Sequence, residues 1–321
     1  MAEQPVWQGR IDKEDEQLGW RWHQVVNQTA DLLPNCHLIG LASDLGVAAN
    51  KGRIGAKDGP QAIRNALANL AWHTQANLLD DGDIVATNSL DKSQRDYAQK
   101  VHNALLNKDF IIGLGGGHEI AWGSYLGLYS AVEHAHINNN NQRQKRIGVI
   151  NFDAHFDLRK PAPFTSSGTP FRQIHQHCTA HNIPFNYACL GVAKTANTQA
   201  LFAFAQHSDT RYLLDEHCSL EAAQSLLVPM LESIDELYVT VCMDAFPPYM
   251  APGVSAPSSL GISADFVIST LRWLAKAQVQ YDFHWALSDV AELNPVYDID
   301  NRTAKLAARV IFEMLQAKFS Q

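Results

Sequence analysis

The stretch IGVINFDAHFDLR, residues 147–159, joins a buried apolar run to a row of alternating polar side chains. Its first part, residues 147–153, is short and mainly apolar, which is typical of a strand buried on both faces of a sheet. Five further runs share this character and lie at residues 37–42, 110–115, 187–192, 237–244 and 284–290. The sequence therefore predicts six buried strands.

Segments whose apolar residues recur with helical spacing alternate with these runs. They lie at residues 59–72, 95–107, 119–135, 219–234, 263–277 and 301–315. This alternation predicts an α/β fold, a single three-layer αβα domain with a mainly parallel sheet between helices. We expect the domain to span residues 36–321 after an N-terminal extension of residues 1–35, and the polar residues 138–146 to form a solvated loop.

The composition excludes several classes of protein. The 321 residues are 46% hydrophobic and 18% charged, with a net charge of -8 and no basic cluster, so we expect no nucleic-acid partner. The N-terminus lacks the apolar core of a signal peptide, and no apolar run is long enough for a membrane span. The five cysteines include no CxxC pair. We therefore expect a cytoplasmic protein that acts on a small polar molecule.

Polar residues follow the predicted strand in the opening stretch, at the edge of a parallel sheet where ligands bind. Asp153, His155 and Asp157 alternate with apolar residues, so an extended chain would direct them, and Arg159, to one side. Such a row is costly to bury without partners, but it suits a metal cluster. The alternative is a solvated strand end in which His155 is merely hydrogen-bonded.

Two other predicted strands end in the same way. In GGGHE, residues 115–119, the glycines let the backbone pass close to another group and place His118 at the entry to a helix. A capping histidine is the alternative there, whereas a phosphate loop is disfavoured because no lysine follows. In TVCMD, residues 240–244, an extended chain would place Thr240, Cys242 and Asp244 on one face.

Together these strand ends offer six candidate metal ligands: His118, Asp153, His155, Asp157, Cys242 and Asp244. Histidines with carboxylates suit Mn²⁺, with Zn²⁺, Fe²⁺, Co²⁺ and Ni²⁺ as competitors, and six ligands are enough for two ions. A metal pair can activate a water, which indicates hydrolysis. The sequence has no G-x-S-x-G elbow, so serine catalysis is the weaker alternative.

The motifs GGGHE, NFDAHFDLR and TVCMDAF with APGVSAP, in that order, resemble the three metal-binding signatures of the ureohydrolase family, which includes arginase and agmatinase. Residues 50–64 and 288–295 resemble the family's N-terminal segment and its substrate-site strand end. The resemblance implies an arginase-like fold, two Mn²⁺ per subunit held by the six candidate ligands, and attack of an activated water on a C=N carbon. It also implies a homo-oligomer.

One ligand departs from the family pattern. Cys242 falls where the family has an aspartate that bridges both ions. A thiolate carries the same formal charge and can bridge two metals, but it is softer, more easily oxidised, and shifts the preference toward Zn²⁺ or Fe²⁺. The alternative is that Cys242 is a small buried apolar residue and that one ion binds weakly or not at all.

The residues around the expected substrate distinguish branches of the family. Phe171, in SGTPFRQ at residues 167–173, stands where arginases have a histidine that transfers protons. This form resembles the formimidoylglutamase branch, which hydrolyses N-formimidoyl-L-glutamate to L-glutamate and formamide in histidine degradation. Arg159 and Arg172 are then expected to bind substrate carboxylates.

The same resemblance implies two catalytic carboxylates. Glu292 would bind the protonated formimidoyl nitrogen, and Asp157 would orient the attacking water and relay its proton. Two alternatives stay open. One is another amidine or guanidine hydrolase, of the guanidinobutyrase or agmatinase type, and the other is a metal-poor relative without catalysis.

Overall fold

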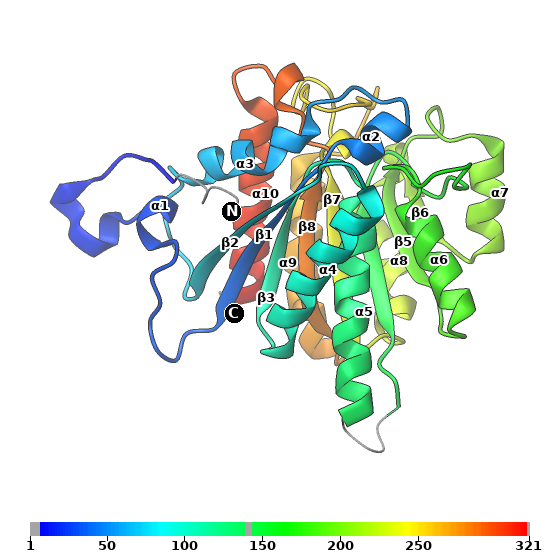
Figure 1. Cartoon of the computed structure of the whole chain (residues 1–321), viewed down its shortest axis with the longest axis horizontal. Helices are drawn as coiled ribbons and strands as arrows, with labels where there is room; N and C mark the ends of the chain where they lie inside the picture. Colours follow the sequence, from blue (N-terminus) through cyan, green and yellow to red (C-terminus); the bar gives the residue numbers. More distant parts are fainter. Residues whose placement is uncertain (1–6, 139–142, 320–321) are drawn as a thin grey trace.

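The computed structural model describes residues 7–138 and 143–319. Within these residues, eight strands form one sheet in the order β2-β1-β3-β8-β7-β4-β5-β6, and all neighbouring strands are parallel (Figure 1). The strands are β1 (Asn35–Ala42), β2 (Asn77–Val85), β3 (Phe110–Gly115), β4 (Ile147–Phe152), β5 (Asn186–Val192), β6 (Arg211–Leu214), β7 (Glu236–Cys242) and β8 (His284–Ala291). The predicted parallel sheet is confirmed.

Helices cover both faces of the sheet, which confirms the three-layer architecture (Figure 1). One layer contains α3 (Gly59–Leu67), α8 (Leu220–Leu231), α9 (Ala264–Gln280) and α10 (Arg302–Phe319). The other contains α4 (Leu90–Leu106), α5 (Ile120–Asn138), α6 (Pro170–Ala180) and α7 (Gln199–His207). The short helices α1 (Trp22–Val25) and α2 (Leu45–Ala49) lie outside these layers. No helix among the described residues is long and apolar enough to cross a membrane.

All six predicted strands are present, with ends that differ from the predicted ends by two residues at most. The sequence does not predict the edge strands β2 and β6. β2 carries Asp80, Asp81 and Asp83 around a glycine, and β6 has only 4 residues, so neither shows an apolar run. Edge strands commonly carry charges, which discourage pairing with other chains. Apolar runs therefore locate the centre of this sheet but not its edges.

Two apolar clusters fill the space between the sheet and its helical layers. Side chains of one strand alternate between them: in β3, Ile112 and Leu114 join the cluster under α3, α9 and α10, whereas Ile111 joins the cluster under α4 and α5. Successive strand residues point to opposite faces. Because both faces are covered, the strand reads as a continuous apolar run rather than as an alternating one.

The N-terminal segment packs against the domain. Trp22 is fully buried, and its backbone N–H donates to the carbonyl of Leu70 at 3.1 Å. The division into an extension of residues 1–35 and a domain of residues 36–321 stays a prediction, and residues 1–6 and 320–321 lie outside the described residues. Of the predicted loop at residues 138–146, residues 139–142 also lie outside them.

A buried ion pair fastens helix α3 to the edge strand β2. Arg64 is fully buried and donates from Nε and Nη2 to the two carboxylate oxygens of Asp80, both at 2.9 Å. Its Nη1 donates to Asp83 at 2.7 Å. Although burial opposes it, the hydrogen bonds that Arg64 donates to Asp80 raise the pKa of Arg64, so the pair stays charged.

Replacing Arg64 by leucine leaves the carboxylate of Asp80 buried without its partner. We expect Arg64→Leu to lower the free energy of unfolding by about 3–5 kcal/mol, measured by urea denaturation. The control is Lys92→Ala, which breaks the exposed pair of Lys92 with Asp96 and should change the same quantity by about 0.5 kcal/mol or less. Similar losses in both variants would contradict the structural importance of the buried pair.

Candidate metal centre

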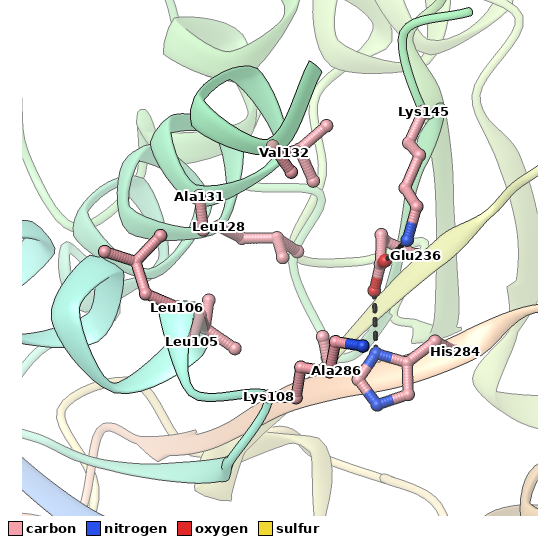
Figure 2. A pocket seen from close by; sticks show the side chains of 11 residues that line it. Leu105, Leu106, Lys108, Leu128, Ala131, Val132, Lys145, Glu236, His284 and Ala286 are labelled. Carbon is pink, nitrogen blue, oxygen red and sulfur yellow. Dashed lines mark hydrogen bonds and ion pairs between the residues drawn. The ribbon is translucent and has the colours of Figure 1, made fainter. Parts of the chain in front are cut away.

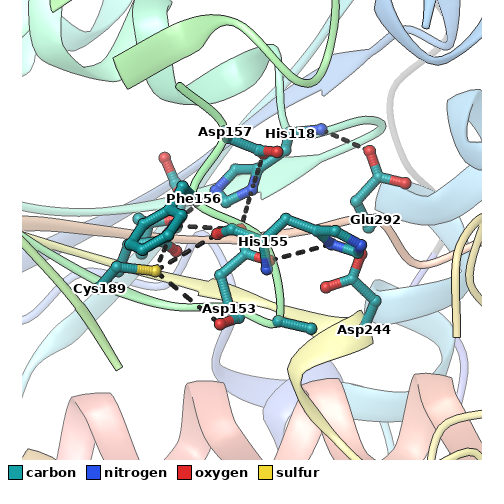
Figure 3. Close-up of polar contacts among 12 residues, drawn as sticks. His118, Asp153, His155, Phe156, Asp157, Cys189, Asp244 and Glu292 are labelled. Atoms are coloured by element: carbon teal, nitrogen blue, oxygen red, sulfur yellow. Dashed lines mark hydrogen bonds and ion pairs between the residues drawn. The ribbon is translucent and has the colours of Figure 1, made fainter. Parts of the chain in front are cut away.

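A polar cluster lies beyond the carboxyl ends of four adjacent central strands (Figure 3). His118 follows β3, Asp153 follows β4, Cys242 is the last residue of β7 and Glu292 follows β8. These strands are neighbours in the order β3-β8-β7-β4, although their sequence positions are far apart. The parallel topology therefore brings the predicted site residues to one edge of the sheet.

The glycine run after β3 sets the position of His118. A Cβ at Gly116 would lie 1.8 Å from the carbonyl oxygen of Ser43, and one at Gly117 would lie 2.0 Å from Oε2 of Glu119. The turn therefore has no room for side chains, as the sequence predicts. The backbone N–H of His118 donates to Oε1 of Glu292 at 2.9 Å, so a carboxylate already occupies the donor that a phosphate would need.

The polar row after β4 is not an extended strand. The strand ends at Phe152, and Asp157 adopts a left-handed backbone conformation with φ 46°. The prediction that strand alternation directs the row to one side is therefore wrong. A turn of the chain achieves the convergence instead: Nδ1 of His118 lies 2.9 Å from Oδ2 of Asp153 and 3.0 Å from Oδ2 of Asp157.

A second turn positions Asp244. Strand β7 ends at Cys242, and Asp244 belongs to a 3₁₀ turn, Met243–Ala245, so the prediction that it shares a strand face with Thr240 is wrong. Its Oδ2 nevertheless lies 3.2 Å from Nδ1 of His155. Turns tolerate close approach of polar groups to one point better than a straight strand, whose same-face residues lie about 7 Å apart.

Five of the six candidate ligands form two overlapping groups. His118, Asp153 and Cys242 make one, Asp153, His155 and Asp244 make the other, and within each group the ligand atoms lie within 4.8 Å of one another. Asp157 adjoins the first group through His118. The structure thus brings all six residues together, while metal ligation by them stays a prediction.

Two unsatisfied atoms test whether these residues fit metal ions. Nδ1 of His118 and Oδ1 of Asp244 are buried and have no hydrogen-bond partner in the described structure. An unpaired buried polar atom costs about 1–3 kcal/mol, more when it is charged. Imidazole nitrogen and carboxylate oxygen are ligands for divalent ions, and one such ion in each group would satisfy both atoms. The residues therefore fit a metal pair.

The charges in the cluster also favour cations. Burial and the neighbouring Asp153 raise the pKa of Asp157 to about 6. Burial, Asp244 and Glu119 raise the pKa of Glu292 well above its usual value. Burial and the surrounding carboxylates likewise raise the pKa of the Cys242 thiol. These shifts have one physical cause, which is negative charge held away from water, and bound dications would oppose all of them.

A layer of partners behind the cluster orients the candidate ligands. Nε2 of His118 is hydrogen-bonded to Oγ1 of Thr240 at 3.1 Å, and Nδ2 of Asn151 donates to Oδ2 of Asp153 at 3.0 Å. A proton on Nε2, held by Thr240, leaves Nδ1 free to bind an ion. Asp289 lies behind Thr240 and accepts from the hydroxyl of Tyr238 at 2.6 Å.

The sequence reasoning misses Asn151 and Asp289. The available signal for Asp289 is a carboxylate inside the otherwise apolar run 284–290, where an unpaired charge would be costly. For Asn151 the signal is an amide in the last part of the run 147–153, two residues before Asp153. Both are polar residues inside predicted buried strands.

Of the candidate substrate residues, Glu292 lies at this cluster, whereas the two arginines line a separate hollow. Glu292 has φ 68° and points into it, held by the N–H of His118 (Figure 3). Arg159 and Arg172 line a hollow of about 430 Å³ together with Leu158, which follows Asp157 in the chain. The guanidinium of Arg172 lies 3.4 Å from the ring centroid of Phe204. Among the described residues, neither arginine has a carboxylate partner.

A second hollow, of about 330 Å³, lies at the opposite edge of the sheet (Figure 2). Glu236, the first residue of β7, accepts there from Lys145 at 2.5 Å and pairs with Nδ1 of His284 at 2.8 Å. Glu236 and Cys242 are six residues apart along one strand, which corresponds to about 20 Å. Both oxygens of Glu236 have partners, so this group joins β4, β7 and β8 at the edge remote from the cluster.

Thr240 offers a test of this layer. Thr240→Val removes the hydroxyl that holds Nε2 of His118 but keeps the side-chain shape. We expect the affinity for Mn²⁺ to fall by about 10–100-fold, measured by competition with a chelator. The control is Thr270→Val, because Thr270 is also buried but bonds only to the carbonyl of Phe266 in α9. Unchanged affinity in Thr240→Val would show that the hydroxyl does not orient the histidine.

Comparisons with known proteins agree with this geometry. The model of the arginase family matches residues 34–316. The formimidoylglutamase of Aliivibrio fischeri is 43% identical over 324 residues, covering 95% of this chain and 93% of that protein. The formimidoylglutamase of Vibrio parahaemolyticus is 44% identical over 329 residues, covering 97% and 93%.

The fold also matches solved structures. The crystal structure of a Trypanosoma cruzi formiminoglutamase variant with Mn²⁺ superposes with a TM-score of 0.77 at 22% identity, covering 93% of this chain and 98% of that one. At this identity the likeness establishes the fold alone. The family match over most of the chain and the relatives above 40% identity establish more: this chain belongs to the arginase family.

Proposed function

We propose that this protein is a formimidoylglutamase, a metal-dependent hydrolase that converts N-formimidoyl-L-glutamate and water to L-glutamate and formamide. Relatives of that name match nearly the whole chain. In the structure, the observation that carries the proposal is the pair of arginines that line one hollow, Arg159 and Arg172, neither of which has a carboxylate partner among the described residues. The substrate has two carboxylates, and arginine binds a carboxylate through two parallel hydrogen bonds.

The metal ligands follow from the two groups. His118, Asp153, Asp157 and Cys242 would hold one ion, and Asp153, His155 and Asp244 the other, with Mn²⁺ as the proposed metal. Bound divalent ions would acidify a water near neutral pH and stabilise negative charge that develops in the transition state. The carboxylate-rich set supports Mn²⁺.

Glu292 is the proposed binding group for the amidine. A protonated formimidoyl nitrogen is a cation, and a buried carboxylate beside it forms a strong charge-assisted hydrogen bond. His118 already orients Oε1 of Glu292 through its backbone N–H, which leaves the other oxygen for the substrate. We assign Glu292 to binding the amidine and orienting the reacting carbon. Burial and neighbouring carboxylates raise the pKa of Glu292, and a cation beside it would lower that pKa and favour the ionised form.

Proton transfer is assigned to Asp157. It lies at the cluster, and its side chain is 12% exposed, whereas that of Asp153 is fully buried. It would orient the attacking water, accept its proton and pass it on. When the C–N bond to glutamate breaks, the leaving amine takes a proton and formamide keeps the other nitrogen.

Phe171 supplies no proton. It is fully buried, its ring is stacked on Tyr187 at 4.4 Å between centroids, and it lies edge-on to His118 at 5.4 Å. The position where arginases have a histidine is therefore a packing position here. Asp157 or solvent must protonate the amine, and this difference favours a substrate other than arginine.

The enzyme is expected to form a homo-oligomer in the cytoplasm, with neither nucleic acid nor membrane as a partner. The five cysteines are all free in the structure, which agrees with a reducing compartment.

A substrate panel tests the activity. Protein stripped of metal and reloaded with Mn²⁺ under reducing conditions should release glutamate and formamide from N-formimidoyl-L-glutamate. We expect kcat/KM for this substrate to exceed that for agmatine, 4-guanidinobutyrate and L-arginine by about 100-fold or more, since those compounds lack one or both of the carboxylates. Higher kcat/KM for agmatine or 4-guanidinobutyrate would overturn the assignment in favour of that hydrolase.

Arg159 tests carboxylate binding. Arg159→Met keeps an unbranched side chain but removes the charge, so we expect kcat/KM for N-formimidoyl-L-glutamate to fall by about 10–100-fold, mainly through KM. Lys276→Met, an exposed cation on α9, is the control for loss of one positive charge and should leave kcat/KM within about twofold. Equal values in both variants would remove Arg159 from the binding site.

A further inference from the structure

We propose that the two ion positions are chemically unequal. Where Mn²⁺ competes with a thiophilic divalent ion of the Zn²⁺, Fe²⁺ or Co²⁺ class, the position at His118 selects the thiophilic ion through the sulfur of Cys242, whereas the position at His155 retains Mn²⁺. With Mn²⁺ alone, both positions hold Mn²⁺. The inference rests on the proposed function only in taking the cluster as a metal centre. It does not depend on which amidine the enzyme hydrolyses.

The geometry distinguishes the two positions. Among the described residues, Sγ of Cys242 belongs to the ligand group of His118 and Asp153 but not to that of His155 and Asp244. Cys242 is 1% exposed and is the last residue of β7, paired in register with Ala291 of β8. The sheet therefore fixes the backbone of Cys242, and strand β7 holds its sulfur at the His118 position.

The surroundings of Cys242 are those of a ligand rather than of a packing residue. Cys36 and Cys178 belong to the two apolar clusters, but Cys242 belongs to neither. Its sulfur lies within 4.8 Å of a ring nitrogen of His118 and of a carboxylate oxygen of Asp153. A small apolar residue gains nothing from such neighbours, whereas a thiolate that shares cations with them is neutralised.

Ligand chemistry then separates the ions. The His155 position offers one imidazole and two carboxylates, a set that suits Mn²⁺. The His118 position offers imidazole, carboxylate and sulfur, a combination found in zinc sites. Mn²⁺ is the weakest binder in the Irving–Williams order, and a soft ligand widens the gap to Co²⁺, Fe²⁺ and Zn²⁺. The sulfur of Cys242 therefore shifts the metal preference of the His118 position toward thiophilic ions. It leaves the ligand set of the His155 position unchanged.

A competition experiment tests the occupancy. Metal-free protein is dialysed under reducing conditions against Co²⁺ and Mn²⁺ in metal-buffered solution, with Mn²⁺ in an excess that offsets its weaker binding to nitrogen and oxygen ligands, and bound elements are counted. We expect about one Co²⁺ and one Mn²⁺ per chain. In Cys242→Asp the Co²⁺-to-Mn²⁺ ratio should fall by about tenfold or more, because the position loses its soft ligand. Two Mn²⁺ per chain in the unmodified protein would overturn the proposal.

Cobalt spectroscopy tests the sulfur directly. A thiolate bound to Co²⁺ gives a charge-transfer band in the near ultraviolet. On stepwise addition of Co²⁺ we expect the full band with the first equivalent and no growth with the second. Asp244→Asn, which weakens the other position, should keep the band, and Cys242→Ser should lose it. The control Cys218→Ser should keep it, because Cys218 is hydrogen-bonded to the carbonyl of Leu214 outside the cluster.

Each contrary outcome has a distinct meaning. No band at full cobalt occupancy would show that Cys242 is not a ligand, and equal growth with both equivalents would show that its sulfur bridges the ions. Either result overturns the proposal. Circular dichroism checks that Cys242→Ser and Cys242→Asp are folded, so two independent variants carry the test. Hydrolysis of N-formimidoyl-L-glutamate is measured separately, so a missing band with turnover rejects only this inference, and a band without turnover rejects only the proposed function.

Discussion

The carboxylate of Asp153 is the interaction on which the rest of the centre depends. It lies between two histidines that come from different parts of the chain, 2.9 Å from Nδ1 of His118 and 3.5 Å from Nδ1 of His155, and it belongs to both groups of candidate ligands. Although burial opposes it, the neighbouring His118 and His155 hold the pKa of Asp153 well below its usual value. This buried negative charge at the end of β4 requires polar or positively charged partners at the neighbouring strand ends.

The general architecture follows from simple patterns, and so do the six candidate ligands. Apolar runs locate the central strands because both faces of the sheet are covered, and polar residues at strand ends mark the site because parallel strands end at one edge. The local conformations could not be predicted in the same way. Asp157 and Asp244 reach the cluster through turns, which depend on contacts between distant segments rather than on the alternation of neighbouring residues.

The backbone conformation at the site explains in part why the sequence does not predict these turns. Asp157 and Glu292 both have positive φ, of 46° and 68°, although neither is a glycine. Residues in this region carry strain that the surrounding structure must offset, and they gather at functional sites. For Glu292 the surrounding contacts are visible: its N–H donates to the carbonyl of Gly116 at 2.8 Å, and its carboxylate accepts from His118. Nothing in the letters of the sequence indicates such a conformation.

Both departures from the arginase pattern, Cys242 and Phe171, lie at the His118 position. The ring of Phe171 packs edge-on to the imidazole of His118, whose side chain is 1% exposed, whereas the side chain of His155 is 22% exposed. One position is thus enclosed by an aromatic ring and a thiol, and the other opens toward solvent. The chemical difference between the two ligand groups therefore coincides with a difference in the solvent exposure of their histidines.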